Sequence, residues 1–218
     1  MSEHSGEHWP GEQAVEVATP PDEDTGEEAA VQEEPAVEEE PAAELEEQLA
    51  GHAPGALDIP DGVDLVEGSP QGTRKRVAIV LSRFNGDVTN RLLESALAEL
   101  DRAGIDREHV TVMPVPGAFE LLLGAMALAK TRRYVAIVAL GCVIRGETAH
   151  FEYVAGEAAS GLQLAALETG VPVSFGVLTT ENLDQAMARA DKGAEAVRSA
   201  LEMADLFNQL RAAAKAAG

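Results

Sequence analysis

Four short apolar runs in the carboxyl-terminal part of the chain alternate with segments of helical spacing. The runs cover residues 77–81, 110–114, 134–140 and 173–177. In the second run Thr111 alternates with valines. The first and third are nearly continuous in Val, Ile, Leu and Ala, which is typical of strands buried on both faces, and the fourth, VSFGV, is interpreted in the same way. The sequence therefore predicts four strands, three of them buried on both sides.

Between and after these runs, apolar residues recur every three or four positions, as they do along one face of a helix. The predicted helices span residues 88–100, 119–130, 151–168, 183–189 and 193–210. Gly104 is suited to close the first helix, Pro116 fits the first turn of the second, and Thr180 is a candidate cap for the fourth.

This order of strands and helices predicts an α/β fold, a parallel sheet with helices on both faces. In such a sheet the segments that follow each strand emerge at the same edge, where ligands bind. Here these segments are residues 83–85, 116–120, 141–150 and 175–182, which carry most of the polar and aromatic residues near the strands. We therefore expect a functional site at this edge.

Charge divides the chain into two parts. The first 73 residues contain 21 Asp and Glu but no Lys or Arg, giving −21, whereas the remaining 145 carry 16 − 17 = −1. Eight of the 11 prolines and the only tryptophan, Trp9, also lie in the first part. We predict a disordered acidic tail over residues 1–62 and one folded domain over 63–218.

The same composition argues against several classes of protein. A nearly neutral domain behind an acidic tail would repel nucleic acid, and the lone Cys142 forms neither an internal disulfide nor a cysteine-based zinc site. The longest apolar stretch, residues 134–144, is well short of the roughly 18 residues of a membrane span, and the amino terminus does not resemble a signal peptide. The expectation is a cytoplasmic protein without metal, membrane or nucleic-acid partners.

The segment after the third run holds the richest chemistry. Between a strand ending at Leu140 and a helix beginning near Phe151 it carries Glu147, Thr148 and His150. A histidine here is suited to general acid or base catalysis, and a helix amino terminus attracts anions. Each residue also has an ordinary interpretation, since His, Glu and Thr commonly cap helices or lie on the surface.

A second group follows the second run. The small residues Gly117 and Ala118 admit a ligand, and Glu120 is able to accept hydrogen bonds from a polyol. The ordinary alternative is a capped helix with Phe119 in the core. Phe84 and Phe175 are candidates to stack on a planar heterocycle, although phenylalanine more often packs in cores.

Three further residues complete the set of candidates. Arg145 and Arg189 are candidate phosphate ligands, and Cys142 is interpreted as a small packed residue and not a nucleophile. The motifs GxxxxGK[ST], GxGxxG, HExxH and GxSxG are absent, which disfavours nucleotide-driven, zinc-hydrolase and serine-hydrolase chemistry. What remains is a site without a cofactor.

Taken together, the motifs resemble those of the lumazine synthase family. They are RFN at 83–85, VPGAFE at 115–120, LGCVIRGETAHFEYV at 140–154 and GVPVSFGVLTTEN at 170–182. The resemblance runs from about Val63 to Leu210 and includes DKGAEAV and ALEMA. It implies a three-layer αβα sandwich with a four-stranded, flavodoxin-like parallel sheet, and condensation of 5-amino-6-(D-ribitylamino)uracil with 3,4-dihydroxy-2-butanone 4-phosphate to 6,7-dimethyl-8-ribityllumazine.

The resemblance also implies a role for each matching residue. His150 matches the proton donor, and the implied substrate-binding residues are Phe84, Ala118, Phe119, Glu120, Cys142, Val143, Ile144, Glu147, Thr148, Phe175 and Arg189. Glu147 and Thr148 match the site of the butanone phosphate, while Phe175 and Arg189 match residues that a neighbouring subunit contributes. A pentamer or a sixty-subunit shell of pentamers with shared active sites is therefore expected, with residues 63–67 as a strand reaching a neighbour.

Two other interpretations stay open. The link between Arg189 and Lys192 is shorter than is usual in the family, which is consistent with a decayed relative that binds lumazine or flavin or only forms shells. A flavodoxin-like electron carrier would instead hold a flavin cofactor. The joint presence of the RFN, GAFE and GETAH motifs argues against both. The resemblance further raises an association with riboflavin synthase or another cargo.

Overall fold

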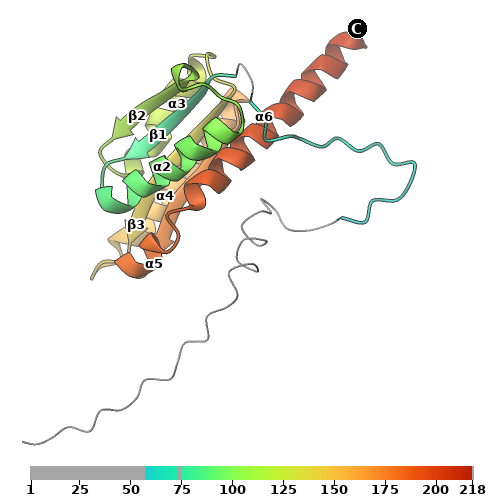
Figure 1. Ribbon diagram of the computed structural model, residues 1–218. Coiled ribbons are helices and arrows are strands. Elements are labelled where there is room, and N and C mark those ends of the chain that lie inside the picture. Colours follow the sequence, from blue (N-terminus) through green and yellow to red (C-terminus); the bar gives the residue numbers. More distant parts are fainter. Residues whose placement is uncertain (1–56, 73–74, 218) are drawn as a thin grey trace, which may run out of the picture. The chain divides into compact units, whose positions relative to one another are not determined.

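The computed structural model describes residues 57–72 and 75–217 of the 218-residue chain. Within these residues strands and helices alternate, as the apolar runs predicted (Figure 1). The strands are β1 (Val77–Ser82), β2 (Val110–Val115), β3 (Ala136–Ile144) and β4 (Val173–Thr180). The α-helices are α2 (Gly86–Arg102), α3 (Leu121–Lys130), α4 (His150–Thr169), α5 (Leu183–Met187) and α6 (Lys192–Ala216). Two 3₁₀ helices, η1 (Arg107–His109) and η2 (Ala118–Glu120), precede β2 and α3.

The four strands form one parallel sheet in the order β2-β1-β3-β4. Alternation along β1 builds a core on each face. Val77 and Ile79 pack with apolar residues of α2 and α6, whereas Ala78 and Val80 pack with those of α3 and α4. The result is the predicted three-layer αβα sandwich with helices on both faces of a parallel sheet.

The central and edge strands differ in burial. β1 is buried along its whole length, and β2, where the sequence shows alternation, is only partly buried at one edge. The prediction that the fourth run is buried on both faces was wrong in part, because Phe175 is 49% exposed; Thr179, just beyond the run, is exposed as well. β4 forms the other edge of the sheet, where no further strand of the described residues pairs with its outer side.

Some boundaries also differ from the prediction. β3 continues four residues past Leu140, so residues 141–144 belong to the strand and not to the following loop. The cap of α5 is Asn182, whose side chain accepts a hydrogen bond from Gln185 N at 2.9 Å. The predicted cap, Thr180, instead donates its hydroxyl to Asn182 O at 3.0 Å. α6 extends to Ala216 because its Ala-rich end continues the helix.

Residues 57–72 form neither helix nor strand. Their last part is held against α6, since Gln209 Nε2 donates to Glu67 O at 2.7 Å and Ser69 N to Asp205 Oδ2 at 3.1 Å. The expected strand at 63–67 is absent from the single chain, where it has no partner strand, and Val63 and Leu65 are 57% and 54% exposed. The predicted disorder of residues 1–62 falls almost wholly outside the described residues.

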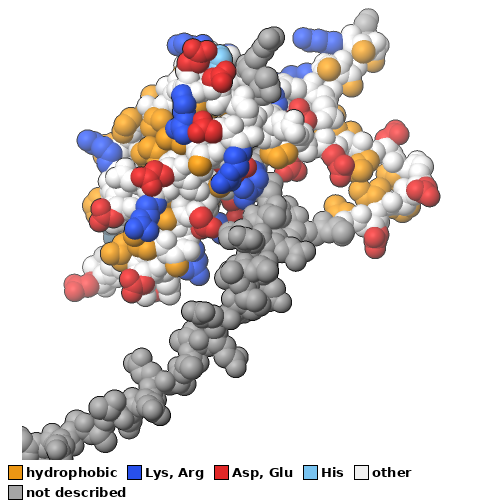
Figure 2. All heavy atoms as spheres, in the orientation of Figure 1, with side chains coloured by type: hydrophobic (Ala, Val, Ile, Leu, Met, Phe, Trp, Pro, Cys, Tyr) orange, Lys and Arg blue, Asp and Glu red, His pale blue; other side chains and the backbone are white. Residues whose placement is uncertain are grey.

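The surface of the folded part carries mixed charge. Figure 2 shows acidic and basic side chains interspersed over the visible face. This matches the near balance of charge after residue 73 in the sequence. None of the helices in the described ranges is both long and apolar enough to cross a bilayer.

Candidate active site

A cavity of about 360 Å³ lies where the carboxyl ends of β1 and β3 meet η2 and the start of α4. This is the edge at which parallel sheets bind ligands. The lining residues are Phe84, Asn85, Gly117, Ala118, Phe119, Glu120, Cys142, Val143, Ile144, Gly146, Thr148, His150, Phe151 and Val154. Nine of the predicted site residues are among them, drawn from three segments far apart in the sequence.

The loop after β1 brings Phe84 and Asn85 to the cavity. Its backbone is tied to the end of β2, because Phe84 N donates to Pro116 O at 3.2 Å. Asn85 adopts a left-handed conformation (φ 58°) at the start of α2, and its Nδ2 donates to Cys142 O at 2.9 Å. Phe84 remains 70% exposed, so its ring is available to a ligand.

The turn before α3 positions Glu120. One carboxylate oxygen, Oε2, accepts a hydrogen bond from Gly117 N at 2.9 Å, which fixes the side chain and leaves Oε1 free of partners among the described residues. A Cβ at Gly117 would lie 3.2 Å from Glu120 Oε2, so a small residue suits this contact. Phe119 is 51% exposed and lines the cavity, contrary to the alternative that placed it in the core.

The end of β3 forms one wall. β1 pairs with β3 only as far as Leu140, while β4 pairs with it up to Ile144. Residues 141–144 therefore have an edge facing the cavity side, where Cys142 O meets Asn85. Because hydrogen-bonding groups alternate along a strand, the backbone N–H and C=O of Ile144 point to this same side. The wall offers peptide groups to a ligand.

The thiol of Cys142 has a different role from its backbone. The side chain is 2% exposed and belongs to the core beneath α2 and α6. Burial raises the pKa of this thiol to about 11, so it is protonated and unreactive near neutral pH. This agrees with its interpretation as a packed residue.

His150 is the first residue of α4, and its exposed side chain lines the cavity. Thr148 also reaches the cavity, whereas Glu147 is exposed and does not line it. The residue before the helix, Ala149, supplies no side-chain cap. The amino end of α4 thus presents backbone N–H groups beside His150 that no side-chain cap satisfies.

Phe175 and Arg189 lie away from the cavity. Phe175 lines a separate hollow on β4 together with Lys192, and Arg189 Nη1 donates to Gln185 O at 2.9 Å. Ser95 of α2 binds the short link after Arg189. Its hydroxyl donates a hydrogen bond to Asp191 O at 2.7 Å and accepts one from Ala194 N at 3.0 Å. In a single chain, these two predicted residues therefore lie apart from the nine predicted residues that line the cavity.

Five lining residues are outside the set of site residues that the resemblance implied, although Gly117 was already a candidate to admit a ligand. Asn85 lies within the RFN motif, and its amide contact to β3 spans 57 residues of sequence, which no local pattern reveals. Val154 lies one helical turn after His150, so helical spacing indicates it once the helix start is known. Gly117, Gly146 and Phe151 adjoin predicted residues in the motifs.

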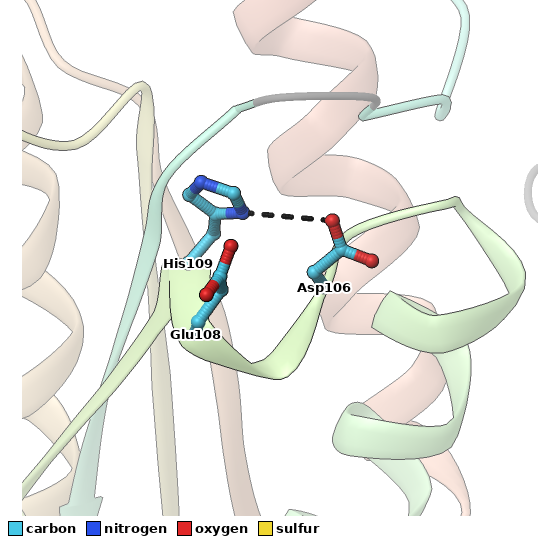
Figure 3. Close-up of side chains that lie close together, drawn as sticks. All are labelled: Asp106, Glu108 and His109. Atoms are coloured by element: carbon cyan, nitrogen blue, oxygen red, sulfur yellow. Dashed lines mark ion pairs between the residues drawn. The ribbon is translucent and has the colours of Figure 1, made fainter.

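A second cluster lies near the amino-terminal end of β2, at the opposite ends of the strands from the cavity (Figure 3). Asp106, Glu108 and His109 gather at η1, just before β2, with His109 Nδ1 3.9 Å from Asp106 Oδ2. Their ligand atoms are close enough to share a cation, but both carboxylates are exposed, and exposed acids commonly gather without a metal. The cluster is remote from the cavity and adds nothing to its chemistry.

Fold and site together define an α/β protein with a ligand cavity at the carboxyl edge of a parallel sheet. Residues 74–208 match the sequence model of 6,7-dimethyl-8-ribityllumazine synthase. The protein of that name from Yersinia pestis (strain Pestoides F) is 49% identical over 155 residues, covering 68% of this chain and 99% of the relative. The corresponding protein of Yersinia pseudotuberculosis serotype O:1b (strain IP 31758) matches equally. The chain belongs to the 6,7-dimethyl-8-ribityllumazine synthase family, which confirms the resemblance in the sequence.

Proposed function

We propose that this chain is a 6,7-dimethyl-8-ribityllumazine synthase of riboflavin biosynthesis. It joins 5-amino-6-(D-ribitylamino)uracil to 3,4-dihydroxy-2-butanone 4-phosphate and releases phosphate and water. The observation that carries the proposal is the convergence of residues 84–85, 117–120, 142–144, 146, 148 and 150 on one cavity in a member of this family. The cavity supplies a stacking ring, a free carboxylate oxygen, peptide groups and a histidine, which are the groups that this condensation uses.

The uracil ring stacks on Phe84. The 70% exposure of this side chain in the single chain supports a ligand on its ring. The backbone groups of Cys142 and Ile144 read the polar edge of the heterocycle, in line with the unpaired edge of β3 facing the cavity side, and Val143 lines the cavity between them. Asn85 holds this edge by its bond to Cys142 O.

The ribityl chain binds along η2. Glu120 is held by Gly117 N through one oxygen, so its other oxygen is positioned to accept hydroxyl hydrogen bonds. Ala118 and Phe119 flank it with a small and an aromatic side chain. A fixed carboxylate next to adjacent hydroxyls distinguishes a polyol from an apolar substituent.

The butanone phosphate binds between Thr148, Glu147 and the amino end of α4, whose N–H groups attract an anion. His150 adjoins this position and transfers protons as the imine forms, phosphate leaves and the ring closes. Holding the two substrates together in the cavity supplies much of the remaining rate. No cofactor takes part in this scheme.

The site is completed by a neighbouring subunit. Among the described residues no Lys or Arg lines the cavity, although a phosphate substrate calls for a cation. Arg189 of a neighbour supplies that cation and Phe175 of the same neighbour closes the heterocycle pocket. The exposed aromatic side chains at 84, 119 and 175 support such a covering subunit. The assembly is a pentamer, alone or in a sixty-subunit shell, and acts in the cytoplasm.

The alternative is a decayed relative that binds lumazine or flavin, or forms shells, without catalysis. The observation that favours it is the short link from Arg189 to Lys192, which places the carboxylate of Asp191 next to the proposed phosphate ligand in sequence and pairs Lys192 with Glu195. Either arrangement weakens phosphate binding.

One experiment distinguishes a synthase from a decayed relative. The purified assembly is mixed with the two substrates, and the fluorescent lumazine and the released phosphate are followed together. A synthase forms both products in step and far faster than the spontaneous reaction. A rate equal to the spontaneous one, with lumazine still bound by the protein, would favour the decayed relative.

A further inference from the structure

Arg145 makes three separate contacts at the end of β3. Its backbone N donates to Thr180 O at 2.8 Å, and its Nε lies 2.5 Å from Glu181 Oε2 at the end of β4. Its guanidinium carbon lies 4.2 Å from the centre of the Phe151 ring. One side chain therefore links the ends of two neighbouring strands to the first turn of α4.

These contacts argue against the phosphate-binding role that the sequence left open for Arg145. The cavity is lined by Ile144 and Gly146 on either side of it but not by Arg145 itself. Its guanidinium is already engaged by a carboxylate and an aromatic ring. The positive charge acts on the protein, away from the lining of the cavity.

The loop after Arg145, residues 146–149, makes few other contacts with the rest of the protein. Among the described residues, no hydrogen bond joins residues 146–148 to another segment, and Ala149 gives α4 no side-chain cap. Phe151, which lies under the guanidinium, lines the cavity and directly follows His150. Phe151 also packs against the core between the sheet, α3 and α4, and its contact with Arg145 adds a second restraint on the first turn of α4.

We infer that Arg145 is a positioning residue, which sets the placement of His150 by holding Phe151 and the loop 146–149 against β4. The expected effect on kcat rests on the proposed function, whereas the contacts of Arg145 are independent of it. It predicts an effect on the chemical step and little effect on substrate binding, because Arg145 does not reach the cavity.

The test uses three variants of the full-length assembled protein and one control. Arg145→Met removes the guanidinium but keeps an unbranched apolar side chain, Arg145→Lys keeps the charge, and Glu181→Gln removes the ion pair but leaves the cation at the Phe151 ring. Arg133→Met is the control, since Arg133 is exposed before β3 and does not line the cavity. Each is measured for particle size, amide hydrogen exchange of residues 146–151, and kcat and KM for both substrates.

For Arg145→Met we expect faster exchange in residues 146–151 and a kcat reduced about 10- to 100-fold, the scale of a misplaced catalytic group, with both KM values within about twofold. Arg145→Lys should recover most of the kcat, Glu181→Gln should show a smaller loss, and Arg133→Met should match wild type. An unchanged exchange pattern with unchanged kcat in Arg145→Met would overturn the inference. So would a selective rise in the KM for butanone phosphate, which would make Arg145 an anion ligand.

Failure of the proposed function is distinguishable from failure of this inference. If the wild-type assembly forms no lumazine, the synthase proposal fails, and the exchange measurement still decides whether Arg145 orders the loop. If wild type is active and Arg145→Met exchanges and reacts like it, only the positioning role fails.

Discussion

At the scale of single residues, most of the site chemistry depends on side chains whose interpretation was ambiguous in isolation. Phe119 is the clearest example, because a phenylalanine in an apolar helix normally packs inside, yet here it is 51% exposed at the cavity. Glu120 similarly serves both as a cap, through Gly117 N, and as a free acceptor. Sequence identifies such residues only when several motifs occur in register.

Arg189 is expected to act on the phosphate substrate from a neighbouring subunit. Arg189→Ala should raise the KM for butanone phosphate roughly 10- to 100-fold, as for loss of a hydrogen bond to a charged group, while the KM for the uracil substrate stays the same. Steady-state kinetics with each substrate varied in turn measures this. Arg133→Ala provides the control for loss of an exposed arginine, and equal kinetics in both variants would dismiss the phosphate contact.

Cys142 yields a prediction about pH. Burial raises the pKa of its thiol from 9.0 in the reference state to about 11, so the native state holds the proton more tightly than the unfolded state. The stability linked to this group is complete below pH 9 and is lost as pH rises through about 11. The Tm of wild type should therefore fall more steeply between these pH values than the Tm of Cys142→Ala. Parallel pH profiles for the two proteins would contradict a raised pKa.

At the scale of elements, the sequence predicted the order, type and approximate extent of the strands and helices, because continuous apolar runs and helical stripes depend on local spacing. It did not place the end of β3, since the residues at 141–144 look like a glycine-containing loop. They remain a strand because β4 pairs with them to Ile144 although β1 has ended. The loss of one partner is a tertiary property, and it creates the peptide wall of the cavity.

The approach of α6 to α2 gives a second prediction at this scale. A Cβ on Gly193 would lie 2.1 Å from Leu92 O, which is backbone and cannot rotate away. Gly193→Ala should therefore destabilise the protein by at least about 1–3 kcal/mol, the usual cost of overpacking, seen as a lower Tm. In Gly156→Ala, within α4, the new Cβ meets nothing within 4 Å of a single chain, and a slight stabilisation of roughly 0.5–1 kcal/mol is expected. A Gly193→Ala protein as stable as wild type would contradict this packing.

At the scale of the whole molecule, a single chain accounts for nine of the twelve predicted site residues but leaves the phosphate without a cation. Phe175 and Arg189 were assigned to a neighbouring subunit by resemblance alone, because neither spacing nor composition shows which subunit completes a site. Their place outside the cavity of this chain is consistent with that assignment, and the assembly itself stays a prediction.

The acidic first part of the chain, residues 1–73, is expected to affect the properties of the whole assembly. It carries most of the excess negative charge, lies outside the family match and falls largely outside the described residues. Sixty copies on a shell would form a dense anionic layer, which would raise solubility, oppose assembly or recruit a basic cargo. Deleting residues 2–56 and measuring particle mass and lumazine formation separates these roles. We expect unchanged size and activity with lower solubility, whereas a larger particle or lost activity would contradict a purely solubilising role.

We expect this cavity to form lumazine with His150 as its proton-transfer group. The most direct measurement is the rate of lumazine formation by assembled wild type, His150→Ala and His109→Ala, the last removing a histidine at the opposite edge of the sheet. With this role for His150, His150→Ala should lose roughly 10²–10⁴ in kcat, the range for general acid–base groups, and His109→Ala should lose none. A wild-type rate no faster than the spontaneous reaction, or an unchanged rate in His150→Ala, would contradict this expectation.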